Sequence, residues 1–119
     1  MNKKYIIKES KVFDSLIKNG QMIKNYNFVV FYQEAKTDYN KYGISVGKKI
    51  GKAHLRNKLK RKVRAIIRNY QKSYPKNYNC IIIIRNSCLN LSYQELEKSL
   101  EGLLNKISKE YSHEKNKTK

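Results

Sequence analysis

The sequence predicts an α+β fold in which helices pack on a single sheet, in the order helix, two or more strands, helix, strand, helix. Apolar residues recur at helical spacing in three segments, and β-branched and aromatic residues run together between them. A length of 119 residues allows one core of modest size. We therefore expect one domain over residues 1–119, with a frayed basic tail at about residues 111–119.

The first helix is predicted over residues 9–19. Its apolar face has spacings of three and four and consists of Val12, Phe13, Leu16 and Ile17. We expect Gly20 to end it, because glycine adopts the positive φ angle of a helix C-terminus at little cost.

Two strands are predicted next. Residues 22–32 form the first, since residues 28–32 are all β-branched or aromatic. Residues 35–41 are polar and predict a turn, after which residues 42–46 form the second strand. The short connection favours a hairpin between these two strands.

The longest helical pattern covers residues 51–74 and ends before Pro75. Its apolar stripe consists of Leu55, Leu59, Val63, Ile66, Ile67 and Tyr70. At about 100° per residue, the opposite face carries Asn57, Arg61, Arg64 and Arg68. The sequence therefore predicts a helix with one face in the core and the rest basic.

The last two elements are a strand and a helix. Residues 79–85 form a continuous apolar run, which is typical of a central strand buried on both faces. Ser92 and Glu95 have the spacing of a capping box. The amphipathic helix that follows has an apolar face formed by Leu96, Leu100, Leu103, Leu104 and Ile107.

The net charge of +18, from 27 basic and 9 acidic residues, indicates a strongly acidic partner: nucleic acid first, an anionic membrane surface second. Lys, Asn, Ile and Tyr are abundant and share AT-rich codons, so base composition explains part of the lysine content. Base composition does not explain the arginines. Four of the five lie within residues 56–68. No acid lies between Asp38 and Glu95, a segment with fourteen Lys and Arg, which is the pattern of a phosphate-binding surface.

Several other classes of function are excluded. The longest apolar run, residues 80–84, is far shorter than the roughly 20 residues of a membrane-spanning helix, and the basic N-terminus lacks the apolar segment of a signal peptide. Cys80 and Cys88 lack metal-ligand spacing and are expected to be buried thiols in a cytoplasmic protein. His54 and His113 are isolated, and no arrangement of acids and histidines suggests a catalytic residue or a metal site.

A family resemblance follows from the central block. Residues 43–53 read Gly-Ile-Ser-Val-Gly-Lys-Lys-Ile-Gly-Lys-Ala and lead into Arg56-Asn57-Lys58, Lys60-Arg61 and Arg64. This block resembles the signature of the bacterial ribonuclease P protein component, whose Arg-Asn-Arg motif appears here as Arg-Asn-Lys. The order of the other elements agrees over nearly the whole chain. The resemblance implies a four-stranded, mostly antiparallel sheet in an αβββαβα order, an α/β sandwich similar to the second domain of ribosomal protein S5.

The resemblance also implies a function. In this family the RNA subunit holds the catalytic Mg²⁺ and removes the 5′ leader of precursor tRNA, while the protein binds no cofactor of its own. The protein's partners are the RNA subunit and the precursor tRNA, not a membrane or a small-molecule substrate. The implied contacts to the RNA subunit are Arg56, Asn57, Lys58, Lys60, Arg61, Arg64 and Arg68. The implied contacts to the leader, between the first helix and the sheet, are Phe13, Ile17, Phe31, Lys48, Lys49, Lys52 and Arg85.

Two residues depart from the family pattern. Lys58 keeps the charge of the motif's third arginine but lacks its bidentate fork, and Ile17 stands where the family usually has an aromatic residue. Two other functions remain open on charge and size alone. One is a small ribosomal protein or general RNA chaperone, and the other is a protein-only nuclease, which the long segment without acids disfavours.

Overall fold

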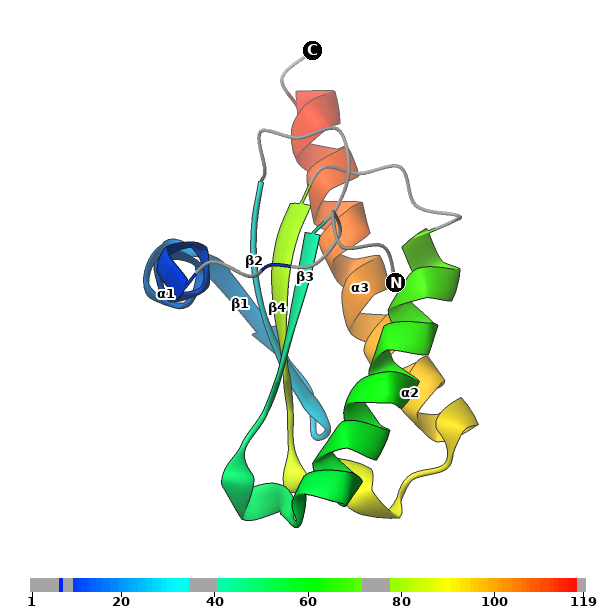
Figure 1. Ribbon diagram of the computed structural model, residues 1–119. Helices are drawn as coiled ribbons and strands as arrows, with labels where there is room; N and C mark the ends of the chain where they lie inside the picture. Colours follow the sequence, from blue (N-terminus) through cyan, green and yellow to red (C-terminus); the bar gives the residue numbers. More distant parts are fainter. Residues whose placement is uncertain (1–6, 8–9, 35–40, 72–77, 118–119) are drawn as a thin grey trace.

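The computed structural model describes residue 7 and residues 10–34, 41–71 and 78–117 (Figure 1). The elements follow the expected αβββαβα order, with two added 3-10 turns. They are α1 (Ser10–Asn19), β1 (Gln21–Lys24), β2 (Phe28–Glu34), β3 (Lys41–Val46), η2 (Lys48–Ile50), α2 (Ala53–Gln71), β4 (Tyr78–Ile84), η3 (Asn86–Asn90) and α3 (Tyr93–Lys117). The predicted turn at 35–41 and the predicted helix end at Pro75 fall largely outside the described residues.

The four strands form one sheet in the order β1-β2-β4-β3. β2 pairs antiparallel with β1 and β4, whereas β3 pairs parallel with β4, so the sheet is mostly antiparallel as expected. The predicted hairpin between residues 22–32 and 42–46 is wrong. β2 has no free edge for β3, because β1 takes one edge and the apolar β4 takes the other.

The expected single strand over residues 22–32 is two strands joined by a tight turn. The Oδ1 atom of Asn25 accepts hydrogen bonds from the backbone N–H groups of Asn27 and Phe28, both at 2.9 Å. Asparagine favours such turns because its side chain imitates a backbone carbonyl. The turn changes which residues share a face: Met22 pairs with Phe31, so their side chains lie together.

Helices cover the two faces of the sheet unequally. Figure 1 shows the sheet edge-on, with α1 on one face and α2 and α3 on the other. The main core lies under α2 and α3 and includes Phe28, Val30, Tyr42, Ile82 and Ile84. A smaller cluster lies under α1 and consists of Ile7, Leu16 and Ile81, with Phe13, Phe31 and Ile83 packed against it. β4 contributes to both, which confirms its predicted central position.

The stripe predicted for α2 is buried at five of its six positions. The exception is Leu55, whose side chain is 38% exposed. It lies in the first turn of the helix and folds back over Gly51, with its Cδ1 atom 3.2 Å from where a Cβ would stand. Gly51 has a φ of 156°, a conformation that favours glycine.

The reason predicted for Gly20 is wrong. Gly51 is the one residue in the described chain with a positive φ angle, so Gly20 does not end α1 in the left-handed conformation. Space explains the glycine instead, since a Cβ at this position would lie 2.5 Å from the Leu16 carbonyl oxygen and 3.0 Å from that of Tyr32. Gly20 therefore lets the chain pass closely between α1 and β2.

The capping box of α3 is confirmed. Ser92 Oγ accepts from the Glu95 N–H at 3.2 Å, and a Glu95 carboxylate oxygen accepts from the Ser92 N–H at 3.1 Å. The predicted leucine face is buried. The helix backbone extends to Lys117, well into the segment expected to be a frayed tail.

Both cysteines are buried, as predicted. Burial raises the pKa of the Cys80 thiol to about 12. Burial also raises the pKa of Cys88 to about 11, although a backbone hydrogen bond acts in the opposite direction. Both groups therefore stay protonated at neutral pH and act as small apolar side chains.

The turn between β1 and β2 is bound to α3 and η3 by side-chain hydrogen bonds. Asn25 Nδ2 donates to the backbone oxygen and to Oγ of Ser99, both at 3.0 Å, and Asn27 Nδ2 donates to the same Oγ at 2.9 Å. Ser87 Oγ donates towards Asn27 Oδ1 at 2.7 Å. These contacts fix the hairpin against the last two elements of the chain.

We predict that Asn25→Ala lowers the free energy of unfolding by about 1–3 kcal/mol, because several partly buried hydrogen bonds are removed together. Urea denaturation measures this change. Asn90→Ala is the matched control, since Asn90 is exposed and should cost less than about 0.5 kcal/mol. Equal effects of the two substitutions would contradict the role given to Asn25.

Candidate nucleic-acid interface

The outer face of α2 is a row of exposed cations. Asn57, Arg61, Arg64 and Arg68 are all exposed, as the helical pattern predicted, and Lys58 is exposed beside them. Arg56 and Lys60 are half-buried at the margin of this face. The buried side of the helix, with Leu59, Val63 and Ile66, holds it against the sheet. We call the seven residues from Arg56 to Arg68 that were singled out in the sequence the α2 basic face.

The other face of the sheet is only partly covered. Phe13 of α1 packs over Gly43 of β3, where a Cβ would stand 3.0 Å from the ring atom Cε2. Phe31 is half-buried in the same cluster. Ile17, one turn further along α1, is 42% exposed. The structure thus brings the three predicted apolar residues to one side of the sheet, but only Ile17 is largely open to solvent.

Beside α1 the strand register places a row of side chains that the helix covers only in part. Lys24 of β1 pairs with Val29, Val29 with Ile83, and Ser45 also pairs with Ile83. Directly paired residues point to the same face, so this row crosses the whole sheet. Lys24 is exposed and the other three are half-buried. We call this row, together with Ile17 and Phe31, the α1 face.

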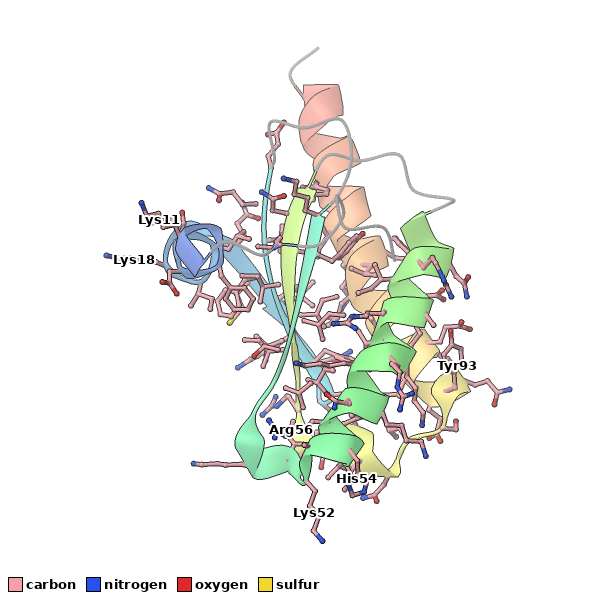
Figure 2. The ribbon with its side chains drawn as sticks, viewed as in Figure 1. Lys11, Lys18, Lys52, His54, Arg56 and Tyr93 are labelled. Carbon is pink, nitrogen blue, oxygen red and sulfur yellow. The ribbon has the colours of Figure 1, made fainter. Side chains whose placement is uncertain are left out.

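The remaining predicted cations gather at one end of the sheet. β3 and β4 are parallel and Val46 pairs with Ile84, so the segments that follow the two strands lie side by side. Lys49 and Arg85 are exposed in these segments, and Lys52 is exposed just before α2. Figure 2 shows Lys52 pointing away from the fold at this end. Only the backbone of Lys48 is described, in η2, so the prediction for its side chain lies outside the described residues.

No described acid lies on α2 or in residues 47–52 and 85–90, whereas α1 carries the exposed Asp14. The acids whose side chains are described are Asp14, Glu34, Glu95, Glu97 and Glu101. Three of them are on α3, and burial together with the neighbouring Glu97 raises the pKa of Glu101. Neither α2 nor the segment from Lys41 to Gln71 contains an acid. The α2 basic face is therefore uncompensated by its own helix.

The chemistry of these side chains is suited to phosphate and bases, and the described residues show no cluster of acids and histidines for hydrolysis. Arg engages phosphate through a planar fork, and partly exposed apolar side chains beside cations bind single-stranded bases. The described residues contain no group of three His, Cys, Asp or Glu that could hold a metal ion. No helix in the described part of the chain is long and apolar enough to span a membrane.

The structure adds residues that the sequence did not single out. Lys24 and Met22 of β1 lie on the side of the sheet that carries Phe31, and Met22 is 52% exposed. Read as one strand, residues 22–32 placed these side chains opposite Phe31. The pair of asparagines at 25 and 27 was the available signal, because asparagine marks turns.

The chain is similar in sequence to proteins of known family. It matches the protein family Ribonuclease P over residues 1–108. The ribonuclease P protein component of Mycoplasma mycoides is 43% identical over 108 residues, which cover 90% of this chain and 99% of that protein. The ribonuclease P protein component of Oceanobacillus iheyensis is 36% identical over 107 residues, covering 89% of this chain and 88% of the relative.

The fold is similar to solved structures of the same family. A variant of the Staphylococcus aureus RNase P protein superposes with a TM-score of 0.83 at 36% identity, covering 90% of each chain. The RNase P protein from Thermotoga maritima gives a TM-score of 0.75 at 34% identity, covering 79% of this chain and 89% of that one. These matches in sequence and fold show that the chain belongs to the ribonuclease P protein component family, the protein subunit of a ribonucleoprotein endoribonuclease.

Proposed function

We propose that this subunit binds two RNA partners through two separate surfaces. The α2 basic face binds the RNA subunit of ribonuclease P, and the α1 face binds the 5′ leader of precursor tRNA. Removal of the leader takes place in the cytoplasm and leaves the mature 5′ end. The observation that carries this proposal is the separation of the two surfaces by the sheet, with α1 on one side and α2 on the other.

The α2 basic face suits a folded RNA. Its exposed arginines lie on one side of a helix that packs on the core, so the points where their side chains leave the helix have fixed spacing. A folded RNA presents phosphates at fixed spacing, and the planar fork of arginine binds phosphate with two hydrogen bonds. Asn57 adds a neutral donor and acceptor among the cations.

The α1 face suits a single strand. Ile17, Phe31 and Val29 offer apolar surface to bases, and Lys24 lies at its edge. Lys49, Lys52 and Arg85 extend the positive charge at the end of the sheet. A positive path beside apolar side chains binds single-stranded nucleic acid with little sequence preference, which fits a leader that differs from one tRNA to another.

Cleavage itself is assigned to the RNA subunit and its Mg²⁺. The protein's part is to neutralise phosphate charge and to hold the leader. In RNA alone, a high concentration of Mg²⁺ neutralises this phosphate charge. Cations of the protein can take over this role, since each phosphate paired with a cation releases condensed counterions.

A reconstitution assay tests the proposed function. Addition of the protein to ribonuclease P RNA should lower the Mg²⁺ concentration needed for 5′ processing of precursor tRNA. An unchanged Mg²⁺ requirement would contradict the proposal. Cleavage of precursor tRNA by the protein alone would support a protein-only nuclease, and equal binding to unrelated folded RNAs would support a general RNA chaperone.

For the α2 basic face we predict that Arg61→Ala or Arg64→Ala weakens binding to the RNA subunit. The slope of log K against log salt should fall by about one unit for each arginine–phosphate ion pair that the substitution removes. Filter binding at several salt concentrations measures both quantities.

Two controls make this test specific. Arg61→Lys should keep the salt slope while reducing the affinity, because lysine keeps the charge without the fork. Lys98→Ala removes one exposed charge from α3 and should change neither quantity. The assignment fails if Lys98→Ala and Arg61→Ala alter the salt slope equally.

For the α1 face we predict opposite effects of two substitutions at Ile17. Ile17→Ser should weaken binding of precursor tRNA by about 1 kcal/mol, or about fivefold, because serine offers the leader less apolar surface. Ile17→Phe should strengthen it, because a ring stacks on a base. Affinities for precursor and mature tRNA, measured in the reconstituted complex, separate the leader from the rest of the tRNA. Equal changes for both ligands would remove Ile17 from the leader site.

A further inference from the structure

The turn between β1 and β2 holds an aromatic ring out in solvent. Tyr26 is 80% exposed, whereas the other tyrosines whose side chains are described are buried or half-buried. An exposed aromatic ring at a fixed position is a stacking platform for an unpaired base. Tyr26 is not part of the leader contacts that the family resemblance implies.

The backbone on both sides of Tyr26 is rigid. Asn25 and Asn27 direct their side chains inward, to the turn itself and to Ser99 of α3. The Ser87 hydroxyl, whose single proton is directed mainly to Asn27 Oδ1 at 2.7 Å, also lies 3.0 Å from the Tyr26 carbonyl oxygen. The polar groups around Tyr26 thus hold the backbone of the turn, while the ring itself is largely exposed. A fixed backbone lowers part of the entropy cost of binding a ligand.

A hollow lies beside this ring. It has a volume of about 350 Å³ and is lined by Tyr26, Arg85, Asn86 and Ser87. It is open to solvent rather than enclosed, so a ligand bound there stays partly exposed. One guanidinium nitrogen of Arg85 donates to the Asn25 carbonyl oxygen at 3.3 Å, which anchors the side chain. Its remaining N–H groups can donate to a phosphate, and Asn86 offers a donor and an acceptor to a base edge.

The hollow continues the α1 face. Ile81 and Ile83 of β4 point to the α1 side, and Arg85 is the next residue in this alternation. The backbone N–H of Arg85 donates to the Asn27 carbonyl oxygen at 3.0 Å, which joins the end of β4 to the turn. From Phe31 to Asn27 the distance along β2 is about 13 Å, at about 3.3 Å per residue. A strand of RNA that passes Phe31 therefore meets the hollow after a short step.

We propose that this hollow is a subsite for one unpaired nucleotide of the 5′ leader, whose base stacks on Tyr26 and whose phosphate pairs with Arg85. The inference rests on the proposed binding of the leader to the α1 face and extends that path beyond it. Only leaders long enough to reach the turn use this subsite.

The test uses the complex reconstituted with ribonuclease P RNA and precursor tRNAs whose leaders lengthen one nucleotide at a time. Tyr26→Ala should weaken binding about 5- to 100-fold once the leader passes a threshold length, and should leave shorter leaders and mature tRNA unchanged. Tyr26→Phe keeps the ring and should bind every leader as the parent protein does. Urea denaturation should give the same midpoint for both variants, because the side chain is exposed.

The outcomes separate this subsite from the function on which it rests. Ile17→Ser is measured in the same series of leaders. Weaker binding with Ile17→Ser but not with Tyr26→Ala at any length overturns the subsite and keeps the α1 face. Unchanged binding with both variants overturns both. An effect of Tyr26→Ala that is equal for mature tRNA, or that appears in binding to the RNA subunit alone, assigns the hollow to another RNA contact and overturns the proposal.

Discussion

The fold depends on the burial of one apolar strand from both sides. β4 lies between β2 and β3, with Ile82 and Ile84 in the main core and Ile81 under α1. β4 pairs antiparallel with β2 and parallel with β3. Because β3 and β4 are parallel, the chain must cross from the end of β3 back to the start of β4, and α2 makes this crossing. That crossing puts the basic helix on one face of the sheet and leaves α1 alone on the other.

The same strand brings the charged groups to their positions. The end of β4 meets the turn at residues 25–27 and lies beside the end of β3, so the segments that carry Arg85 and Lys49 lie at the same end of the sheet. Arginines kept apart from all acids would repel one another in the free protein, and a bound polyanion relieves that repulsion. The core therefore fixes a cation arrangement that becomes favourable when RNA is present.

Much of this fold could be predicted from the sequence, because helical periodicity reports which residues face the core. The apolar stripe of α2 and the basic face opposite to it follow from residue spacing alone, and so does the capping box of α3. Strand pairing could not be predicted, since alternation shows that a strand has a partner without showing which one. The predictions for Leu55 and Gly20 were wrong because periodicity reports neither the exposure of a helix end nor the close approach of two backbone segments. In the candidate site, the outer face of α2 could be predicted from the sequence. The row through Lys24 and the hollow at Tyr26 could not, because locating them requires knowledge of the turn between β1 and β2 and of the strand register.

We propose that the sheet keeps two RNA partners apart, and photo-cross-linking in the reconstituted complex can locate the leader on the protein. Precursor tRNA with 4-thiouridine at successive leader positions would be irradiated, and the linked peptides identified by mass spectrometry. Leader cross-links should fall on peptides from α1, β2 and the end of β4, and the outer face of α2 should stay unlinked. Leader cross-links on Arg61, Arg64 or Arg68 would contradict it.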